Sequence, residues 1–338
     1  MAAKSILLIG GAGYLGTVIT DSLLNAGYKV TCLDNFLFDN NNQIVPYLLN
    51  PNYRFVHGDM SNNDDLGRAL HGVTDVVLLA GLVGDPITKN YPDVGHKINN
   101  LDTVKCIDLL NNRGLESLIF ISSCSNYGLQ PRGKLATETS ELKPASLYAK
   151  AKIEMEEYIM SLKGRVDYVP TVLRFATAFG LSPRMRFDLT VNELVYGSIV
   201  KKELLIFNPG AWRPYCHVKD FARVIDIVIN ANRDKKSFEV FNAGGDINNY
   251  TKQGLVDMIL NYLPDTKITV QDKTADPRDY CVDFTKIKTL LNFEPRYTVN
   301  DGIVEILNAF DQHIYARSEL EIALNPNAYG NIKLKTVE

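Results

Sequence analysis

The sequence predicts an α/β fold, in which a doubly wound parallel sheet is followed by a smaller C-terminal α/β lobe. Short apolar runs alternate with helical patterns through the first half of the 338-residue chain. A glycine-rich loop joins the first apolar run to the first helical pattern, as is typical of such sheets. Beyond about residue 180, glycine, proline and arginine become frequent and strand patterns become fewer, which indicates a second structural unit.

The predicted strands are brief continuous apolar runs rather than alternating ones, as expected of parallel strands that are covered on both faces. In chain order they are 5–9, 29–33, 53–57, 75–79, 118–122 and 168–173. Helical patterns lie between them at 13–25, 64–71, 99–113 and 146–163. This regular succession of strand and helix predicts the parallel sheet.

The chain divides into three predicted parts. Residues 1–180 form the sheet domain, to which later segments such as 218–245 are expected to return. Residues 181–317 form the smaller lobe, laid over the carboxyl edge of the sheet, where open α/β sheets bind ligands. Residues 318–338 are weakly patterned and rich in asparagine, and we expect a loose or partner-dependent tail.

Composition excludes several classes of protein. A formal net charge of −3 and an isoelectric point near 6.0 argue against a nucleic-acid binder, which usually carries a basic patch. No apolar stretch approaches the ~18–20 residues that span a bilayer, and the first residues leave no room for a signal peptide. The five cysteines are scattered without a CxxC pair, so we expect no metal site, no disulfide framework and a cytoplasmic location.

The glycine-rich loop predicts a dinucleotide site. Gly10, Gly13 and Gly16 follow the first strand and open the first helix, where backbone N–H groups can approach a pyrophosphate. Asp34 ends the second strand, 18 residues after Gly16, where a carboxylate accepts hydrogen bonds from ribose hydroxyls and repels a 2′-phosphate. Because Thr17 rather than an arginine follows Gly16, NAD is favoured over NADP.

Further cofactor contacts are assigned to neighbouring strand and helix ends. Asp59 closes the third strand, where its carboxylate could reach the adenine amine; a solvated loop carboxylate is the alternative. The other residues assigned to the cofactor are Tyr14, Leu15, Asn35, Met60, Leu79, Ala80, Gly81, Asn99, Tyr148 and Lys152.

Two later segments predict redox chemistry. Tyr148 and Lys152 are four residues apart, so they share one face of a helix. A tyrosine has a pKa of about 10, which a nearby ammonium and a charged nicotinamide would lower. Ser123, just after the fifth strand, could bind the same substrate oxygen while Tyr148 takes a proton from an alcohol. Taken alone, the YxxxK pattern would equally fit a surface tyrosine beside a solvated lysine.

Together, GGAGYLG, Asp34, SSCSNYG, YAKAK and LRFATAFG resemble the extended short-chain dehydrogenase/reductase family that acts on nucleotide sugars, over roughly residues 4 to 310. The resemblance implies a Rossmann domain that holds NAD and a C-terminal lobe that holds a nucleotide-diphosphate sugar. It assigns the catalytic roles to Ser123, Tyr148 and Lys152. It also implies a homodimer formed through helices 99–113 and 146–163.

The same resemblance narrows the reaction. The 4,6-dehydratases of the family carry Asp-Glu where this chain has Cys124 and Ser125, so dehydration by the usual route is disfavoured. For Cys124 a small buried packing role is the favoured interpretation. We therefore expect a 4-epimerase that passes through a 4-keto sugar. A net 4-dehydrogenase or 4-ketoreductase acting on an activated heptose or deoxysugar remains an alternative, as does a non-catalytic NAD-binding protein.

Arginines of the lobe are the candidate diphosphate ligands, because guanidinium groups hold phosphate oxygens bidentately. Arg213 and Arg278 lie where the family places such clamps, with surface ion pairs as the alternative. Thr177 and Phe179 replace the family's Asn and Tyr, which suggests altered substrate contacts. Segment 81–86 could line the sugar pocket or form a conformationally demanding turn. For His217, a hydrogen-bonded structural role is favoured. The residues assigned to the substrate are Ser123, Cys124, Ser125, Thr177, Arg184, Arg186, Asn192, Arg213, Tyr215 and Arg278.

Overall fold

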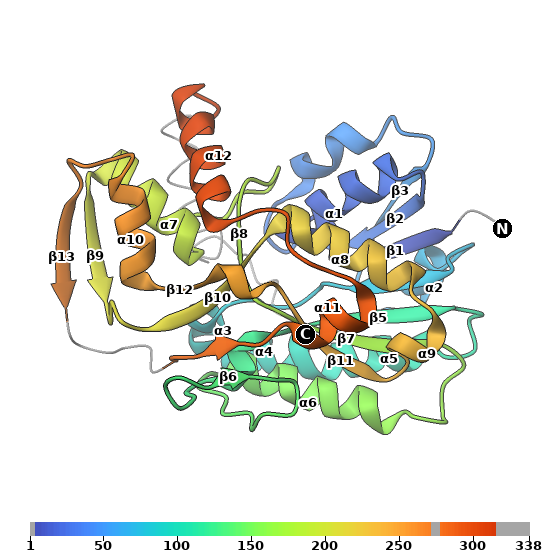
Figure 1. Ribbon diagram of the computed structural model, residues 1–338. Helices are drawn as coiled ribbons and strands as arrows, with labels where there is room; N and C mark the ends of the chain where they lie inside the picture. The colour runs from blue at the N-terminus through green and yellow to red at the C-terminus, as the bar shows by residue number, and fades with distance from the viewer. Residues whose placement is uncertain (1–3, 272–277, 316–338) are drawn as a thin grey trace.

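A central sheet of seven parallel strands dominates the computed structural model, which describes residues 4–271 and 278–315 (Figure 1). Its spatial order is β11-β7-β5-β4-β1-β2-β3. The strands are β1 (Ser5–Ile9), β2 (Lys29–Asp34), β3 (Tyr53–His57), β4 (Asp75–Leu78), β5 (Ser117–Ser123), β7 (Val169–Phe175) and β11 (Glu239–Ala243). The strand order reverses between β1 and β4, and this switch point is where such sheets bind ligands.

Helices cover both faces of this sheet. On one face lie α1 (Tyr14–Asn25), α8 (Val218–Asn230) and α11 (Thr285–Leu291). On the other lie α2 (Asn63–Ala69), α5 (Thr103–Leu110) and α6 (Leu147–Ser161). Along β1, Ile6 and Leu8 pack into the first core, and Leu7 and Ile9 pack into the second. Burial on both faces explains why this strand is a continuous apolar run in the sequence.

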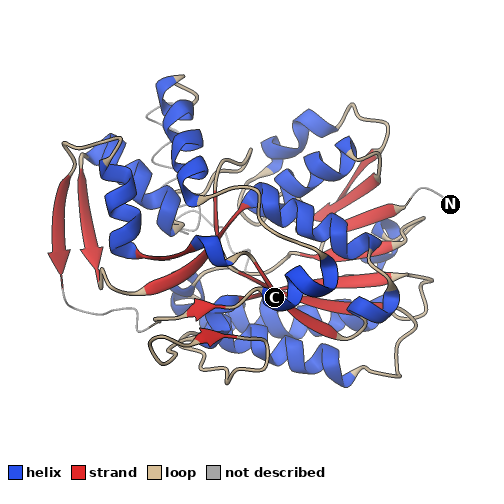
Figure 2. Ribbon diagram, in the orientation of Figure 1, coloured by secondary structure: helices blue, strands red, loops and turns tan. Residues whose placement is uncertain are grey.

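The smaller lobe has its own sheets and core (Figure 2). Its strands are β8 (Thr177–Phe179), β9 (Glu203–Phe207), β10 (Trp212–His217), β12 (Asn249–Thr251) and β13 (Lys267–Gln271). β8, β10 and β12 form one sheet, and β9 pairs with β13 in parallel. The helices that pack on them are α7 (Thr190–Tyr196), α10 (Lys252–Leu260) and α12 (Val299–Asp311).

Short elements connect these parts: η1 (Asn41–Tyr47), α3 (Asp85–Asn90), α4 (Pro92–His96), η2 (Lys97–Asp102), η3 (Cys124–Tyr127), β6 (Leu135–Ala136), η4 (Gly197–Lys201), α9 (Arg233–Lys236), η5 (Asp246–Asn248) and β14 (Cys281–Val282). Among the described residues, none of the helices combines the length and apolarity that crossing a membrane requires.

The predicted fold class is confirmed, and the six predicted strands correspond to β1–β5 and β7 with ends that differ by at most two residues. The predicted helix 99–113 is wrong at both ends: helical structure starts at Pro92, passes through the π-helical turn η2 and ends at Leu110. The strand β11 was not predicted as a strand, although it lies in segment 218–245, which was expected from the sequence to return to the sheet domain; there it pairs with β7 and completes the sheet. The predicted tail, 318–338, lies outside the described residues.

Candidate active site

A cavity of about 1230 Å³ lies between the central sheet and the lobe. Its walls come from the carboxyl ends of β1, β2, β4 and β5 on one side and from segment 184–190, α7 and β9 on the other. A pocket for one drug-sized ligand has a volume of ~300–1,000 Å³. The cavity therefore has room for a cofactor together with a second ligand.

The glycine loop forms the cofactor end of this cavity. Gly10 has φ +82°, and a Cβ there would lie 2.7 Å from the backbone of Ala80. A Cβ on Gly16 would lie 2.5 Å from the carbonyl oxygen of Gly11, so the loop and the helix fit together only without side chains. The first turn of α1 carries no acidic residue. Its N-terminal N–H groups therefore present an anion site that suits the pyrophosphate of NAD.

Asp34 is held by the same loop. Its Oδ2 accepts a hydrogen bond from the backbone N–H of Ala12 (3.0 Å), and its Oδ1 accepts one from Phe36 (2.9 Å). Burial raises the pKa of this carboxyl, and the two backbone N–H groups oppose the rise. The carboxylate lines the cavity, where it can accept hydrogen bonds from a ribose. These features fit the NAD site that the sequence predicts.

Most of the other predicted cofactor residues line the cavity; they are Gly13, Tyr14, Leu15, Asn35, Asp59, Met60, Leu79, Ala80 and Gly81. Asn35 donates from Nδ2 to Asp59 (3.2 Å), which joins the ends of β2 and β3. Asn99 lies behind the wall: its side chain accepts from the N–H of Leu82 (2.7 Å) and donates to the carbonyl of Leu82 (3.0 Å). Asn99 therefore supports the loop after β4 rather than facing the cavity.

Ser123, Tyr148 and Lys152 all line this cavity. The ammonium of Lys152 lies 5.8 Å from the centre of the Tyr148 ring and donates to the carbonyl of Ile121 (2.7 Å). Burial lowers the pKa of Lys152 to about 8, although the carboxylate of Glu156 partly opposes this. Enclosure in the cavity raises the pKa of the Tyr148 phenol, and the charge of Asp85 adds to the increase.

A buried ion pair supports the serine segment from behind. Glu156, one turn after Lys152 on α6, accepts charge-assisted hydrogen bonds from Arg174 of β7: Nε lies 3.1 Å from each carboxylate oxygen, and Nη2 lies 2.6 Å from Oε2. The same carboxylate accepts hydrogen bonds from Ser122 and from Asn126 (2.9 Å). The pair therefore links β5, α6 and β7 immediately behind the catalytic side chains. Ser123 itself accepts a hydrogen bond from the Ser125 hydroxyl (2.8 Å).

The arginines of the lobe reach different parts of the cavity. Arg213 is buried against the Tyr280 ring, 5.2 Å from its centre. Arg278 forms an ion pair with Asp85 at 2.8 Å. Each of them lines the cavity, as the predicted diphosphate clamps should.

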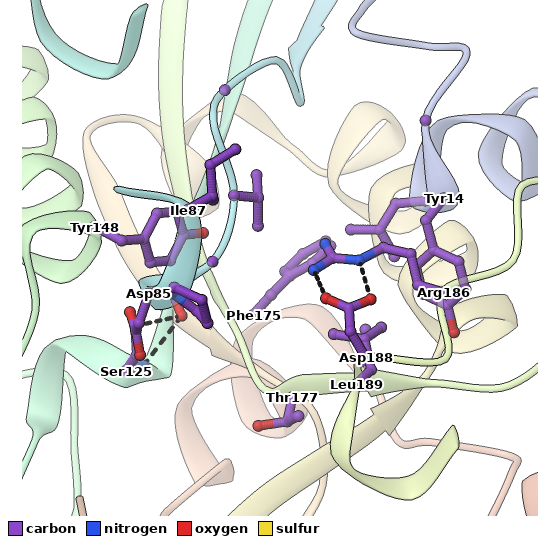
Figure 3. Close-up of a pocket in the computed structure, with 18 of the residues that line it drawn as sticks. Tyr14, Asp85, Ile87, Ser125, Tyr148, Phe175, Thr177, Arg186, Asp188 and Leu189 are labelled. Atoms are coloured by element: carbon purple, nitrogen blue, oxygen red, sulfur yellow. Dashed lines mark hydrogen bonds and ion pairs between the residues drawn. The ribbon is translucent and has the colours of Figure 1, made fainter. Parts of the chain in front are cut away.

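Arg184 and Arg186 lie in the loop that follows β8. Arg186 is held bidentately by Asp188 (3.0 and 2.6 Å), and Figure 3 shows this pair facing the cavity. Arg184 lies 5.0 Å from the centre of the Phe38 ring and near enough to Asp34 to oppose the rise of its pKa. Arg184 therefore lies near Asp34, at the predicted cofactor end of the cavity, whereas the sequence assigned it to the substrate.

Three residues that the sequence assigned to the substrate do not line the cavity. Asn192 is fully buried, where it accepts from the N–H of Gly180 (3.0 Å) and donates to the Tyr14 hydroxyl (3.0 Å). Tyr215 is fully buried in the core of the lobe. Cys124 points its thiol at the carbonyl of Arg174 (3.2 Å), in keeping with the packing role. By contrast, Thr177 and Ser125 do line the cavity.

Several charged residues of the wall were not predicted. Asp85 lies at the start of α3, after Gly84, whose φ of +126° agrees with the demanding turn expected in segment 81–86. From the sequence, segment 81–86 was expected to form either a sugar pocket or a demanding turn, with no role of its own for Asp85, and most of this segment does line the cavity. The others are Asp102, Asp188, Glu193, Lys201, Glu203 and Lys252. Each stands alone in the sequence, so no spacing pattern could identify it.

The chain is similar in sequence to known proteins. Residues 6–244 match the family model described as the NAD dependent epimerase/dehydratase family. The chain is 25% identical over 331 residues to a UDP-glucose 4-epimerase from Corynebacterium glutamicum, covering 93% of this chain and 97% of that protein. It is 26% identical over 313 residues to a dTDP-glucose 4,6-dehydratase from Streptomyces niveus, covering 89% of this chain and 90% of that protein.

A solved structure shares the fold. The UDP-glucuronic acid 4-epimerase from Bacillus cereus, in complex with UDP-glucuronic acid and NAD, superimposes with a TM-score of 0.82 at 23% identity. The match covers 92% of this chain and all of the other, 100%. The likeness therefore extends through the central sheet and the smaller lobe.

Proposed function

Because the chain belongs to the NAD dependent epimerase/dehydratase family, and is an NAD-dependent enzyme of the extended short-chain dehydrogenase/reductase type, we propose that it epimerises nucleotide-diphosphate sugars at C4. The reaction passes through a transient 4-keto sugar. The observation that carries this proposal is the convergence of Ser123, Tyr148 and Lys152 on one cavity that also holds the glycine loop.

Each of the three side chains has a distinct task. Tyr148 takes the proton from the C4 hydroxyl, and the ammonium of Lys152 favours the phenolate that this requires. Ser123 donates a hydrogen bond to the same substrate oxygen. Bound NAD supplies the hydride acceptor, and in an epimerase the hydride donor as well. Arg213 and Arg278 bind the diphosphate from the lobe side of the cavity.

The positions that follow Ser123 favour epimerisation over dehydration. Expelling water from C6 needs an acid and a base, and the family's dehydratases carry them at these two positions. Here Cys124 is buried with its thiol on a backbone carbonyl, and Ser125 is a neutral hydroxyl. Burial raises the pKa of the Cys124 thiol well above its usual range, so the thiol stays protonated and inert.

Product analysis tests the reaction. The purified protein is denatured to identify released nucleotides by mass spectrometry, and native protein is incubated with a panel of nucleotide sugars. We expect bound NAD, no net NADH absorbance and an inverted C4 centre by NMR. Stoichiometric NADH with a 4-keto product would make the enzyme a net dehydrogenase, and a protein that never binds NAD would contradict the assignment.

The Tyr148→Phe variant separates an enzyme from a protein that only binds NAD. Removal of the phenolic hydroxyl leaves the ring, so NAD binding should persist while turnover falls by ~10²–10⁴-fold. Unchanged turnover in this variant would remove Tyr148 from the mechanism.

We also propose a homodimer, joined through α5 and α6, in the cytoplasm. Leu101, in η2 just before α5, and Leu147, the first residue of α6, are 59% and 47% exposed, as suits residues that a partner would cover. All five cysteines are free thiols, which suits a reducing compartment. Light scattering should give twice the monomer mass, and Leu101→Glu should reduce it to that of a monomer.

A further inference from the structure

Asp85 is a carboxylate at the reacting end of the cavity. It starts α3 and lines the cavity, and Figure 3 shows it at the same end as Tyr148. Its charge acts directly on the Tyr148 phenol, and its Oδ2 pairs with Arg278 at 2.8 Å. Asp85 thus lies between the group that takes the C4 proton and one of the arginines that bind the diphosphate.

A bound sugar must occupy the same interval. The proposed function places C4 at Tyr148 and the diphosphate at Arg278, so the sugar ring lies between them, along Asp85. The second oxygen of Asp85, Oδ1, is buried and has no hydrogen-bond partner among the described residues. A buried acceptor of this kind is costly until a donor reaches it, and a sugar hydroxyl is such a donor.

The same carboxylate disfavours a second negative charge. In a uronic acid, C5 carries a carboxylate next to C4, which would bring it close to Tyr148 and so close to Asp85. Two arginines around this end are already paired with carboxylates, Arg278 with Asp85 and Arg186 with Asp188, and the Lys152 ammonium donates to the carbonyl of Ile121. Two carboxylates held close together repel each other, and burial of one of them strengthens the repulsion; the Asp85 side chain is 27% exposed.

We propose that Asp85 makes the sugar site selective for nucleotide sugars with a neutral, hydroxyl-bearing ring and selective against nucleotide uronic acids. This inference rests on the proposed function, since it uses the placement of C4 at Tyr148. It predicts a substrate class different from the UDP-glucuronic acid bound by the structurally similar Bacillus cereus enzyme.

The test compares matched sugar pairs. NAD-loaded protein is titrated with UDP-glucose and UDP-glucuronic acid, and in parallel with GDP-mannose and GDP-mannuronic acid. Within each pair the base is constant, so the ratio of dissociation constants reports the sugar alone. We expect the neutral sugar of at least one pair to bind on the order of tenfold or more tightly than its uronic acid.

Two variants identify the cause. Asp85→Asn keeps the size and one acceptor but removes the charge, and should reduce the ratio about tenfold, mainly through tighter binding of the uronic acid. Asp93→Asn removes an exposed charge from the neighbouring helix α4 and should leave the ratio unchanged. The NAD content of each variant, measured after denaturation, shows whether the cofactor site is intact.

The outcomes separate the two proposals. Equal binding of neutral and acidic sugars by the wild-type protein, or an unchanged ratio in Asp85→Asn, would overturn the selectivity. Selective binding without inversion at C4 would overturn the proposed reaction and leave the selectivity standing. If none of the four sugars binds, both proposals are wrong.

Discussion

Lys152 has to be charged for catalysis, yet it is buried. The Lys152 residue is only 5% exposed. Burial lowers the pKa of its ammonium to about 8, although the carboxylate of Glu156 partly opposes this decrease. A lysine in water keeps its proton to a pH of about 10.4. The stabilisation of the Tyr148 phenolate is therefore lost just above neutral pH.

The pH profile of kcat/KM should show this loss. We expect kcat/KM to fall as the pH rises past about 8, because the neutral amine no longer favours the phenolate. In Lys152→Arg, which stays charged at every accessible pH, the decline near 8 should be absent even if the overall rate is lower. A decline at the same pH in this variant would assign it to another group.

The same shift acts on stability with a definite sign. Between pH 8 and about 10.4 the unfolded chain keeps a proton on Lys152 that the folded chain has released. The unfolded state therefore binds more protons, so the contribution of Lys152 to stability rises with pH across this window. Other groups also change stability with pH, so the contribution of Lys152 is read as a difference. The change in unfolding free energy from pH 7 to pH 10, measured in urea, should be more positive in the wild type than in Lys152→Met.

Helix α6 positions two catalytic side chains within its first two turns. Ser146 caps this helix, since its hydroxyl accepts a hydrogen bond from the N–H of Ala149 (3.2 Å). If the N-terminal end of α6 frayed, Tyr148, the second residue of the helix, would be the first catalytic side chain to lose its position. The cap is thus expected to matter more for turnover than for the rest of the fold.

The variant Ser146→Ala should lose ~1 kcal/mol of stability together with several-fold or more of kcat, because Tyr148 loses its fixed position. The matched control is Thr298→Ala, which removes the cap of α12, a helix whose end bears no catalytic residue. It should lose similar stability and keep its kcat. Urea unfolding measures the stability of the two variants, and steady-state kinetics measure their kcat. An equal drop in kcat in both variants would show that the Ser146 cap has no special role in positioning Tyr148.

The ion pair of Glu156 and Arg174 joins α6 to β7. Both side chains are about 5% exposed, so removing one leaves the other charge buried without its partner. We expect Glu156→Gln to destabilise the protein by ~3–5 kcal/mol. Glu157→Gln, an exposed neighbour on the same helix, should change stability by less than ~0.5 kcal/mol. A small effect of Glu156→Gln in urea unfolding would show that the pair contributes little.

At the level of elements, the strands β1–β5 and β7 could be predicted from the sequence because each is a continuous apolar run. The start of helix 99–113 was wrong because tertiary contacts decide it: Asn99 bonds to the backbone of Leu82, within the π-helical turn η2. Among site residues, motif positions such as Gly10 and Tyr148 could be predicted. Segment 81–86 was offered as a possible sugar pocket, but no role could be assigned to Asp85 itself, because a lone carboxylate acquires its role only when the fold brings Arg278 beside it.

At the scale of the whole molecule, the two lobes are joined around α1. The hydroxyl of Tyr14, at the start of that helix, donates to the carbonyl of Gly180 (2.7 Å), and Thr17 bonds to Ser182 (3.0 Å). These contacts attach the pyrophosphate loop to the segment that leads into the lobe. Cofactor and substrate sites are therefore held in one geometry by buried hydrogen bonds.

A fragment experiment tests whether the sheet domain is independent. Fragment 1–180 lacks α8, which packs against α1, and β11, which pairs with β7. We expect it to aggregate and to bind no NAD, whereas fragment 1–245, which restores both elements, should be more soluble. Cooperative unfolding of fragment 1–180 by circular dichroism would contradict this expectation.

The position of β11 also has a consequence for synthesis. The strands β9 and β10 of the lobe are made before β11, which fills the last place in the central sheet beside β7. On the ribosome, the backbone edge of β7 therefore stays open until residue 243 has emerged from the exit tunnel. During that interval the nascent chain presents an unpaired strand, the kind of edge on which chains associate with one another and which chaperones protect.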